Sequence, residues 1–104
     1  MSVVVVAYVH PEPEHRDEVI AALEDAIARV HAEDEGCELY ALHEADDGRL
    51  VFVEKWASAE ALGAHAAAAP LAEANARLEG KTSRPAEVLV LRPHPAGTQA
   101  QGTL

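Results

Sequence analysis

The sequence predicts an α+β domain of the ferredoxin-like split βαβ type: a four-stranded antiparallel sheet with two helices on one face. The main observation is the order of its segments, β-α-β-β-α-β, within 104 residues. The first and last of the strand-like segments, residues 3–9 and 87–92, are apolar at consecutive positions, which is typical of strands covered on both faces. The two middle ones flank Asp47-Gly48, a pair that favours the positive φ angles of a hairpin turn between antiparallel neighbours.

The first strand and the first helix are separated by two prolines. Residues 3–9 are mostly valine and end before Pro11 and Pro13, which cannot continue a central strand. A helix is expected from about residue 14 to 32, with Gly36 as its stop signal. The apolar residues of this helix recur at spacings of three and four and form one buried stripe: Val19, Ile20, Leu23, Ile27 and Val30.

The second half of the chain contains the hairpin, a broken helix and the last strand. The hairpin strands are residues 37–44 and 50–56. Ser58 can cap the next helix, and Pro70 begins a second helical piece that Gly80 ends. After the last strand the domain ends at about residue 93, and the small, polar tail of residues 94–104 is expected to be mobile.

Charge and composition exclude several classes of function. The formal net charge of -10 repels nucleic acid and anionic lipid, so neither is an expected partner. The single cysteine, Cys37, cannot form an internal disulfide, and because no signal peptide or long apolar run is present, we expect the protein in the cytoplasm. The six histidines lack the spacing of a metal site, and no phosphate or dinucleotide loop occurs, so neither a metal nor a cofactor is expected.

The apolar residues also predict a homodimer. Hydrophobic residues make up 49% of the chain, but 22 of them are alanine, so a monomeric core would be thin. Two helices cover one face of the sheet, yet residues 3–9, 50–53 and 87–92 are apolar toward both faces. A second copy packed sheet against sheet would cover the other face, and the alternative is a sheet with a few exposed valines.

Two segments resemble the antibiotic biosynthesis monooxygenase family. Residues 53–65, Val-Glu-Lys-Trp-Ala-Ser-Ala-Glu-Ala-Leu-Gly-Ala-His, are similar to the family's strand-to-helix pattern of Glu-x-Trp, a polar cap and Ala-His. Residues 35–40, Glu-Gly-Cys-Glu-Leu-Tyr, resemble its entry to the second strand. The resemblance spans about residues 3–93 and implies a dimeric α+β barrel. For activity it implies oxygenation of quinols or aromatic polyketides without metal or flavin, degradation of haem, or isomerisation of a small metabolite.

The residue types are most similar to those of the quinol monooxygenase branch, which has the same types as Tyr40, Glu54, Trp56 and His65. Polyketide-oxidising members carry an Asn and a Tyr where this chain has Phe52 and Leu62, and the residues of the haem-degrading members are also absent. Leu71 follows Pro70 where the quinol branch commonly has a histidine, which removes one candidate proton carrier.

The candidate catalytic residues are His65 and Glu54. His65 lies three residues after Leu62 on a helix, near its buried stripe, and an imidazole suits proton transfer near neutral pH. Glu54 could orient the imidazole or bind a substrate hydroxyl. The alternatives are a structural histidine and a structural bond from Glu54 to a backbone N–H or to an arginine such as Arg77 or Arg84.

The candidate substrate-binding residues are Trp56, Phe52, Tyr40 and Leu62. Phe52, Glu54 and Trp56 alternate on one strand and so share a face, where the indole could stack on an aromatic substrate or act as a core anchor. Tyr40 could donate to a substrate oxygen or pack across strands.

The function expected from these residues is cofactor-independent monooxygenation of a small quinol or phenolic substrate by dioxygen, with His65 as the base. The alternatives are an isomerase of a small oxygenated metabolite and a non-catalytic dimeric domain that binds small molecules.

Overall fold

The computed structural model describes residues 2–104 of the chain. Its strands are β1 (Val3–Pro11), β2 (Cys37–Glu44), β3 (Leu50–Trp56) and β4 (Thr82–Leu91). Its helices are α1 (Arg16–Glu33), α2 (Ala59–Ala67), α3 (Ala69–Leu78) and α4 (Gln99–Gly102), and a 3-10 turn at Pro13–His15 precedes α1.

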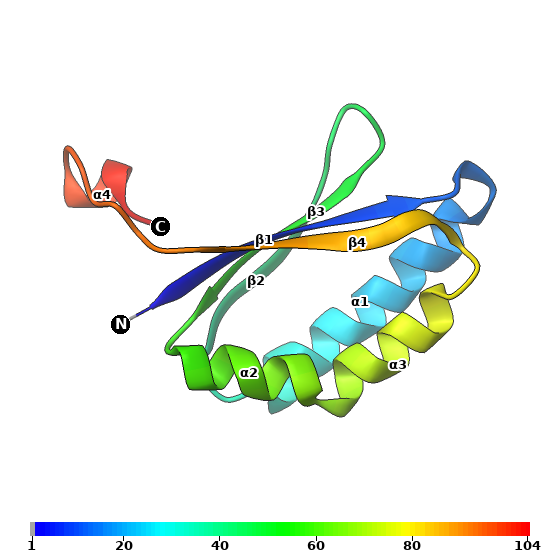
Figure 1. The fold of residues 1–104 in the computed structure, drawn as a ribbon, viewed down its shortest axis with the longest axis horizontal. Helices are drawn as coiled ribbons and strands as arrows, with labels where there is room; N and C mark the ends of the chain where they lie inside the picture. The colour runs from blue at the N-terminus through cyan, green and yellow to red at the C-terminus, as the bar shows by residue number, and fades with distance from the viewer. Residues whose placement is uncertain (1) are drawn as a thin grey trace.

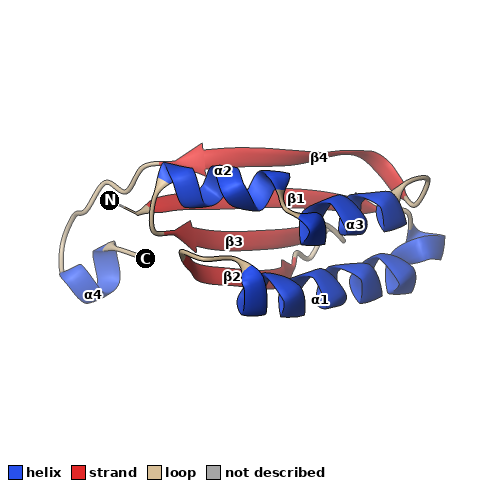
Figure 2. Ribbon diagram, turned by 90° about the horizontal axis from the view of Figure 1, so that it is seen from below, coloured by secondary structure: helices blue, strands red, loops and turns tan. Residues whose placement is uncertain are grey.

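The four strands form one antiparallel sheet in the order β2-β3-β1-β4. Figures 1 and 2 show α1, α2 and α3 together on one face of this sheet. The central pair, β1 and β3, lies between the edge strands β2 and β4, as the split βαβ order requires. The predicted ferredoxin-like α+β fold is therefore confirmed.

The turns largely follow the predicted chemistry. Gly48 has a φ of +95° and donates its N–H to the carbonyl of Ala45, while no non-glycine residue in the described chain has a positive φ. Asp47 therefore keeps an ordinary φ, and only one of the two expected positive angles is present, as in a type I turn closed by a left-handed glycine. The Ser58 hydroxyl accepts the N–H of Ala61, so the predicted cap of α2 is confirmed.

Two strands are longer than the sequence predicts. β1 continues to Pro11, and β4 begins at Thr82 rather than at residue 87. Both additions pair with each other at one end of the sheet, where the register is irregular. β4 is an edge strand, so Pro85 can lie in it with the side that lacks an N–H facing outward. Beyond β4, the tail contains the short helix α4, which stands away from the sheet in Figure 1. The mobility of this tail stays a prediction.

The core lies between the sheet and α1. It consists of alternate residues of β1 and β3 together with one stripe of α1, as the spacing predicts. The residues buried in it include Val5, Val9, Leu50, Phe52, Trp56, Val19, Leu23 and Val30.

The opposite face of the sheet has no helix over it. The register places Val6, Val53 and Leu89 in one row across β3, β1 and β4 on this face, which we call the outer face. Leu89 is 48% exposed, and Val6 and Val53 are half-buried. Apolar side chains thus remain open to solvent on the outer face, as the sequence predicts for a single copy.

The helices also leave β4 uncovered on their own side. Val88 and Val90 lie opposite the buried residues Ala7 and Val5 of β1, and so face the helices. They are nevertheless 60% and 61% exposed, and the main helix–sheet contacts are those of α1 with β2 and of α2 with β3. An open apolar strip therefore borders the core on the β4 side.

Candidate active site

The candidate site lies at the end of β3, where the strand meets α2. Burial alternates along β3, so Phe52, Glu54 and Trp56 all point toward the helices, as predicted. Glu54 is 4% exposed, and its Oε1 accepts a hydrogen bond of 2.9 Å from the Nε1–H of Trp56, which is fully buried. Burial raises the pKa of Glu54, and the bond from Trp56 and the charge of His65 oppose that rise. One of the two carboxylate oxygens of Glu54 is therefore engaged in a hydrogen bond with the indole.

His65 is the only buried residue of α2. Its ring lies over the ring of Trp56, with 4.4 Å between centroids and 31° between planes. The ring of Tyr40 meets it nearly edge-on at 5.2 Å. The imidazole is therefore held between an indole and a phenol, on the inner side of the helix, as its position relative to Leu62 predicts.

A carboxylate contacts one nitrogen of the imidazole. The Nδ1 of His65 lies 2.7 Å from Oδ2 of Asp34, and both side chains are more than nine-tenths buried. A carboxylate can only accept a hydrogen bond, so Nδ1 carries the proton and Nε2 has a free lone pair in the neutral ring. The expectation that Glu54 orients His65 is not met: Oδ2 of Asp34 contacts Nδ1 of His65, while Glu54 accepts a hydrogen bond from Trp56.

Asp34 could not be predicted from the sequence pattern, because it is 31 residues from His65 and lies outside the two segments that resemble the family. It is the C-cap residue of α1, and its N–H donates to the carbonyl of Val30. A carboxylate at a helix C-terminus opposes the helix dipole. That unfavourable placement, just before Gly36, was the available signal.

Tyr40 lies opposite Glu54 on β2 and closes the far side of the cluster. Its ring is 4.7 Å from that of Phe52 and 6.1 Å from that of Trp56. Burial, together with the negative charges of Glu54 and Asp34, raises the pKa of the Tyr40 phenol above its ordinary value. The hydroxyl therefore stays protonated and can donate a hydrogen bond.

Three polar atoms of this cluster have no hydrogen-bond partner within residues 2–104: Nε2 of His65, Oε2 of Glu54 and the hydroxyl oxygen of Tyr40. In the same residues, every fully buried side-chain nitrogen or oxygen has a partner. These three atoms therefore touch solvent-accessible space, although their residues are more than 90% buried. The cluster has a proton acceptor, a carboxyl oxygen and a phenolic donor available to a ligand.

The candidate site residues are closely packed and leave no open pocket among them: Phe52, Glu54, Trp56 and His65 are buried, and Leu62 is half-buried. A cavity of about 260 Å³ lies toward the other end of the sheet, between α3 and the strands β1 and β4. It is lined by Val9, Asn75, Leu78, Glu79, Thr82 and Ala86. None of the candidate site residues lines this cavity.

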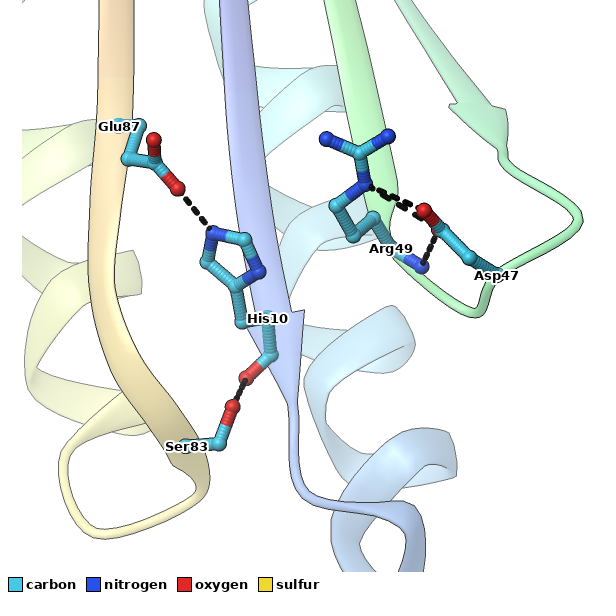
Figure 3. A network of polar contacts seen from close by, with 5 residues as sticks. All are labelled: His10, Asp47, Arg49, Ser83 and Glu87. Carbon is cyan, nitrogen blue, oxygen red and sulfur yellow. Dashed lines mark hydrogen bonds and ion pairs between the residues drawn. The ribbon is translucent and has the colours of Figure 1, made fainter.

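A second polar cluster lies at the hairpin end of the sheet, as Figure 3 shows. His10 Nε2 is 2.7 Å from Oε1 of Glu87, and Arg49 binds Asp47 and lies over the ring of Tyr8. Its charged groups are paired with one another.

Within the described residues, no three His, Cys, Asp or Glu side chains are grouped as metal ligands would be. No helix within residues 2–104 is both long and apolar enough to cross a bilayer.

Comparison with known proteins assigns a family to this arrangement. The family model described as "Antibiotic biosynthesis monooxygenase" matches residues 2–77. The protein named "Putative monooxygenase Rv0793" from Mycobacterium tuberculosis is 37% identical over 92 residues, which cover 88% of this chain and 90% of that protein.

Solved structures agree with this family. The structure of Rv0793 has a TM-score of 0.85 at 30% identity and covers 94% of this chain and all of its own. A "putative antibiotic biosynthesis monooxygenase" from Caulobacter crescentus has a TM-score of 0.82 at 25% identity, over 86% of this chain and 87% of its own. A conserved protein from Methanosarcina mazei, at 21% identity and a TM-score of 0.81 over 88% of this chain and 92% of its own, shares the fold.

Proposed function

Because the chain belongs to the antibiotic biosynthesis monooxygenase family, we propose that it oxygenates a small quinol or related phenol without a cofactor, and that Nε2 of His65 is the base. The observation that carries this proposal is the state of the imidazole. It is buried and stacked on Trp56, its Nδ1 is engaged, and its Nε2 is free and in contact with solvent-accessible space. A base in an apolar site of this kind is what deprotonation of a phenol requires.

The proposed reaction begins with proton transfer. The substrate O–H breaks, the proton passes to Nε2, and the electron pair stays on the phenolate oxygen. The electron-rich anion then reduces dioxygen. One oxygen atom enters the ring and the other leaves as water, so quinol and dioxygen give a hydroxyquinone and water. No external reductant is needed, because the quinol supplies the electrons.

The other site residues bind and orient the substrate in this proposal. Phe52, Leu62 and Trp56 supply apolar walls, and the hydroxyl of Tyr40 donates to a substrate oxygen. Oε2 of Glu54 accepts a hydrogen bond from a second hydroxyl of the substrate. Since α2 has only one buried side chain, a small shift of this helix is the economical way to admit a single aromatic ring.

The test is oxygen uptake with a panel of reduced quinols, each corrected for autoxidation without protein. Uptake above this background should fall by roughly 10² or more in His65→Ala. The matched control is His43→Ala, because His43 is exposed on the same sheet and should be dispensable. Unchanged uptake in His65→Ala would exclude it as the base. Turnover without oxygen consumption would favour an isomerase, and ligand-induced melting shifts without turnover would favour a binding domain.

We also propose that two copies pack through the outer face of the sheet. The support is the row of apolar side chains that no helix covers, with Leu89 and Leu91 48% and 41% exposed. Burying such a row is the main favourable term in forming a homodimer.

Sedimentation equilibrium at micromolar concentration tests this dimer. We expect about twice the chain mass of 11.1 kDa. Val53→Asp, at the centre of the outer face, should give a monomer because it would bury a charge. Ala21→Asp is the control, since Ala21 is exposed on α1. A wild-type monomer would refute the proposal.

A further inference from the structure

We infer that Asp34 is a positioning residue for His65: it fixes the imidazole with its proton on Nδ1, so that Nε2 is the nitrogen that receives the substrate proton. This inference rests on the proposed function for its chemical consequence, but its structural part can be tested without turnover. Neither the family motif quoted above nor the predicted site includes Asp34.

The contact has the geometry of a charge-assisted hydrogen bond. The distance of 2.7 Å from Nδ1 of His65 to Oδ2 of Asp34 is short, and both side chains are shielded from water, at 6% and 8% exposed. Rotation of the ring would break this bond and leave the carboxylate without its partner, which is costly at such burial. The imidazole is therefore held in one orientation.

The backbone around Asp34 is itself held on both sides. Its N–H caps the end of α1 through the carbonyl of Val30. Two residues later, the carbonyl of Gly36 accepts the N–H of Ala57, just before α2 begins. Gly36 has a φ of +80°, and a Cβ built on it would lie 2.7 Å from that of Ala61. The loop is thus pressed against the first turn of α2, the same helix that carries His65.

The charges around Asp34 indicate that its carboxylate has a role beyond stabilising the fold. Asp34 lies at the C-terminal, negative end of the α1 dipole, where a carboxylate is disfavoured. His65 lies in the last turn of α2, where a positive charge is favoured. When Nε2 takes the substrate proton, the imidazolium that forms faces the Asp34 carboxylate and both helix C-termini. The site is arranged to stabilise the imidazolium that forms when Nε2 takes this proton.

Glu54 cannot take over this role in the observed arrangement. Its Oε1 accepts from Trp56, and the Nδ1 face of the imidazole is occupied by Asp34. The two buried carboxylates therefore have different roles. Asp34 contacts the side of His65 that faces away from the substrate, and Glu54 has one oxygen free to bind the substrate.

The first experiment measures the tautomer. In protein with ¹⁵N-labelled histidine, at a pH where the ring is neutral, His65 should show its proton on Nδ1, and the signal is assigned by its loss in His65→Ala. Asp34→Asn is isosteric but can turn its amide N–H toward Nδ1, so a large share of the proton should move to Nε2. Glu35→Gln removes a charge at the exposed neighbouring position and should leave the tautomer unchanged.

The second experiment measures turnover on the quinol that the wild type uses best. Asp34→Asn should lower kcat by roughly 10² or more, with KM changed by less than about threefold, because Asp34 does not touch the substrate. Glu35→Gln should keep the wild-type kcat. A merely structural role for Asp34 would change the melting temperature without moving the tautomer.

Wild-type protein with the proton on Nε2 would overturn the inference, and so would Asp34→Asn with an unchanged kcat. If Asp34→Asn does not fold, the wild-type tautomer still decides. If no quinol supports oxygen uptake, the proposed function fails on its own, while the tautomer still shows whether Asp34 orients His65.

Discussion

Replacement of Trp56 by phenylalanine should cost stability mainly through its hydrogen bond to Glu54. The indole N–H is the only donor to Glu54 among the described side chains, and both residues are almost completely buried. A hydrogen bond to a charged group contributes about 1.5–3 kcal/mol, and the smaller ring leaves a space in the core that adds up to about 1 kcal/mol. We therefore expect Trp56→Phe to lower the free energy of unfolding by about 2–4 kcal/mol, or the melting temperature by roughly 10–25 °C.

The cost should depend on pH with a defined sign. Burial raises the pKa of Glu54, and the bond from Trp56 opposes that rise. Without the indole donor, the folded-state pKa of Glu54 rises further. The charge-dependent part of the cost of Trp56→Phe is therefore fully present above the folded-state pKa of Glu54 in the variant. It shrinks as the pH falls from there to the folded-state pKa of Glu54 in the wild type.

Glu54→Gln is the matched variant, because its amide oxygen can still accept from Trp56 while the buried charge is removed. Since the folded-state pKa of Glu54 is raised above its unfolded value, the wild type loses stability as the pH rises through that range. Glu54→Gln lacks this loss, so it should be more stable than the wild type at neutral pH and similar to it in acid.

The assay is urea unfolding followed by circular dichroism, for all three proteins, at about pH 8 and about pH 4. Comparison at one pH cancels the titration of the groups that the proteins share. A cost for Trp56→Phe that is below about 0.5 kcal/mol, or equal at both pH values, would refute the reasoning. So would a Glu54→Gln variant that is less stable than the wild type at about pH 8.

Three backbone predictions concern the start of α2 and are checked by the same unfolding assay. Gly36→Ala should destabilise the fold by about 2–3 kcal/mol, because its φ is +80° and the new Cβ would overlap that of Ala61; a loss under about 0.5 kcal/mol would contradict this. Gly63→Ala should instead add about 0.5–1 kcal/mol, since Gly63 is exposed within α2 with no atom within 4 Å of the new Cβ, and any destabilisation would count against it. Ser58→Ala should cost about 1 kcal/mol through loss of the cap to Ala61, whereas Ser58→Asp should retain most of it.

The fold could be predicted because its signals are local. Spacings of three and four identify α1, consecutive valines identify β1, and Asp47-Gly48 marks the hairpin. The extension of β4 to Thr82 could not be predicted in this way. Residues 82–86 carry no apolar alternation and include Pro85, and they are strand only because β1 pairs with them at the edge of the sheet.

The site could be predicted in part for the same reason. Alternation along β3 places Glu54 and Trp56 on one face, and helical spacing turns His65 inward. Which carboxylate pairs with which donor depends on tertiary contacts. Asp34 reaches His65 across the junction of α1, β2 and α2. Glu54, which the sequence suggested as the partner of His65, instead accepts a hydrogen bond from Trp56, two residues further along β3. Local periodicity carries no information on such partners.

The polar site and the proposed dimer are linked by the small amount of apolar surface in the chain. At the end of β3 under α2, the space that a larger core would fill with aliphatic side chains holds Glu54, His65 and Asp34. These groups are costly to bury and add little to the stability of a single copy. The apolar core that remains runs along β1 and β3 beneath α1, and further apolar side chains lie on the outer face of the sheet. A chain with this distribution gains most from covering its outer face, so we expect Glu54→Gln, which removes one buried charge, to make the isolated monomer of Val53→Asp measurably more stable.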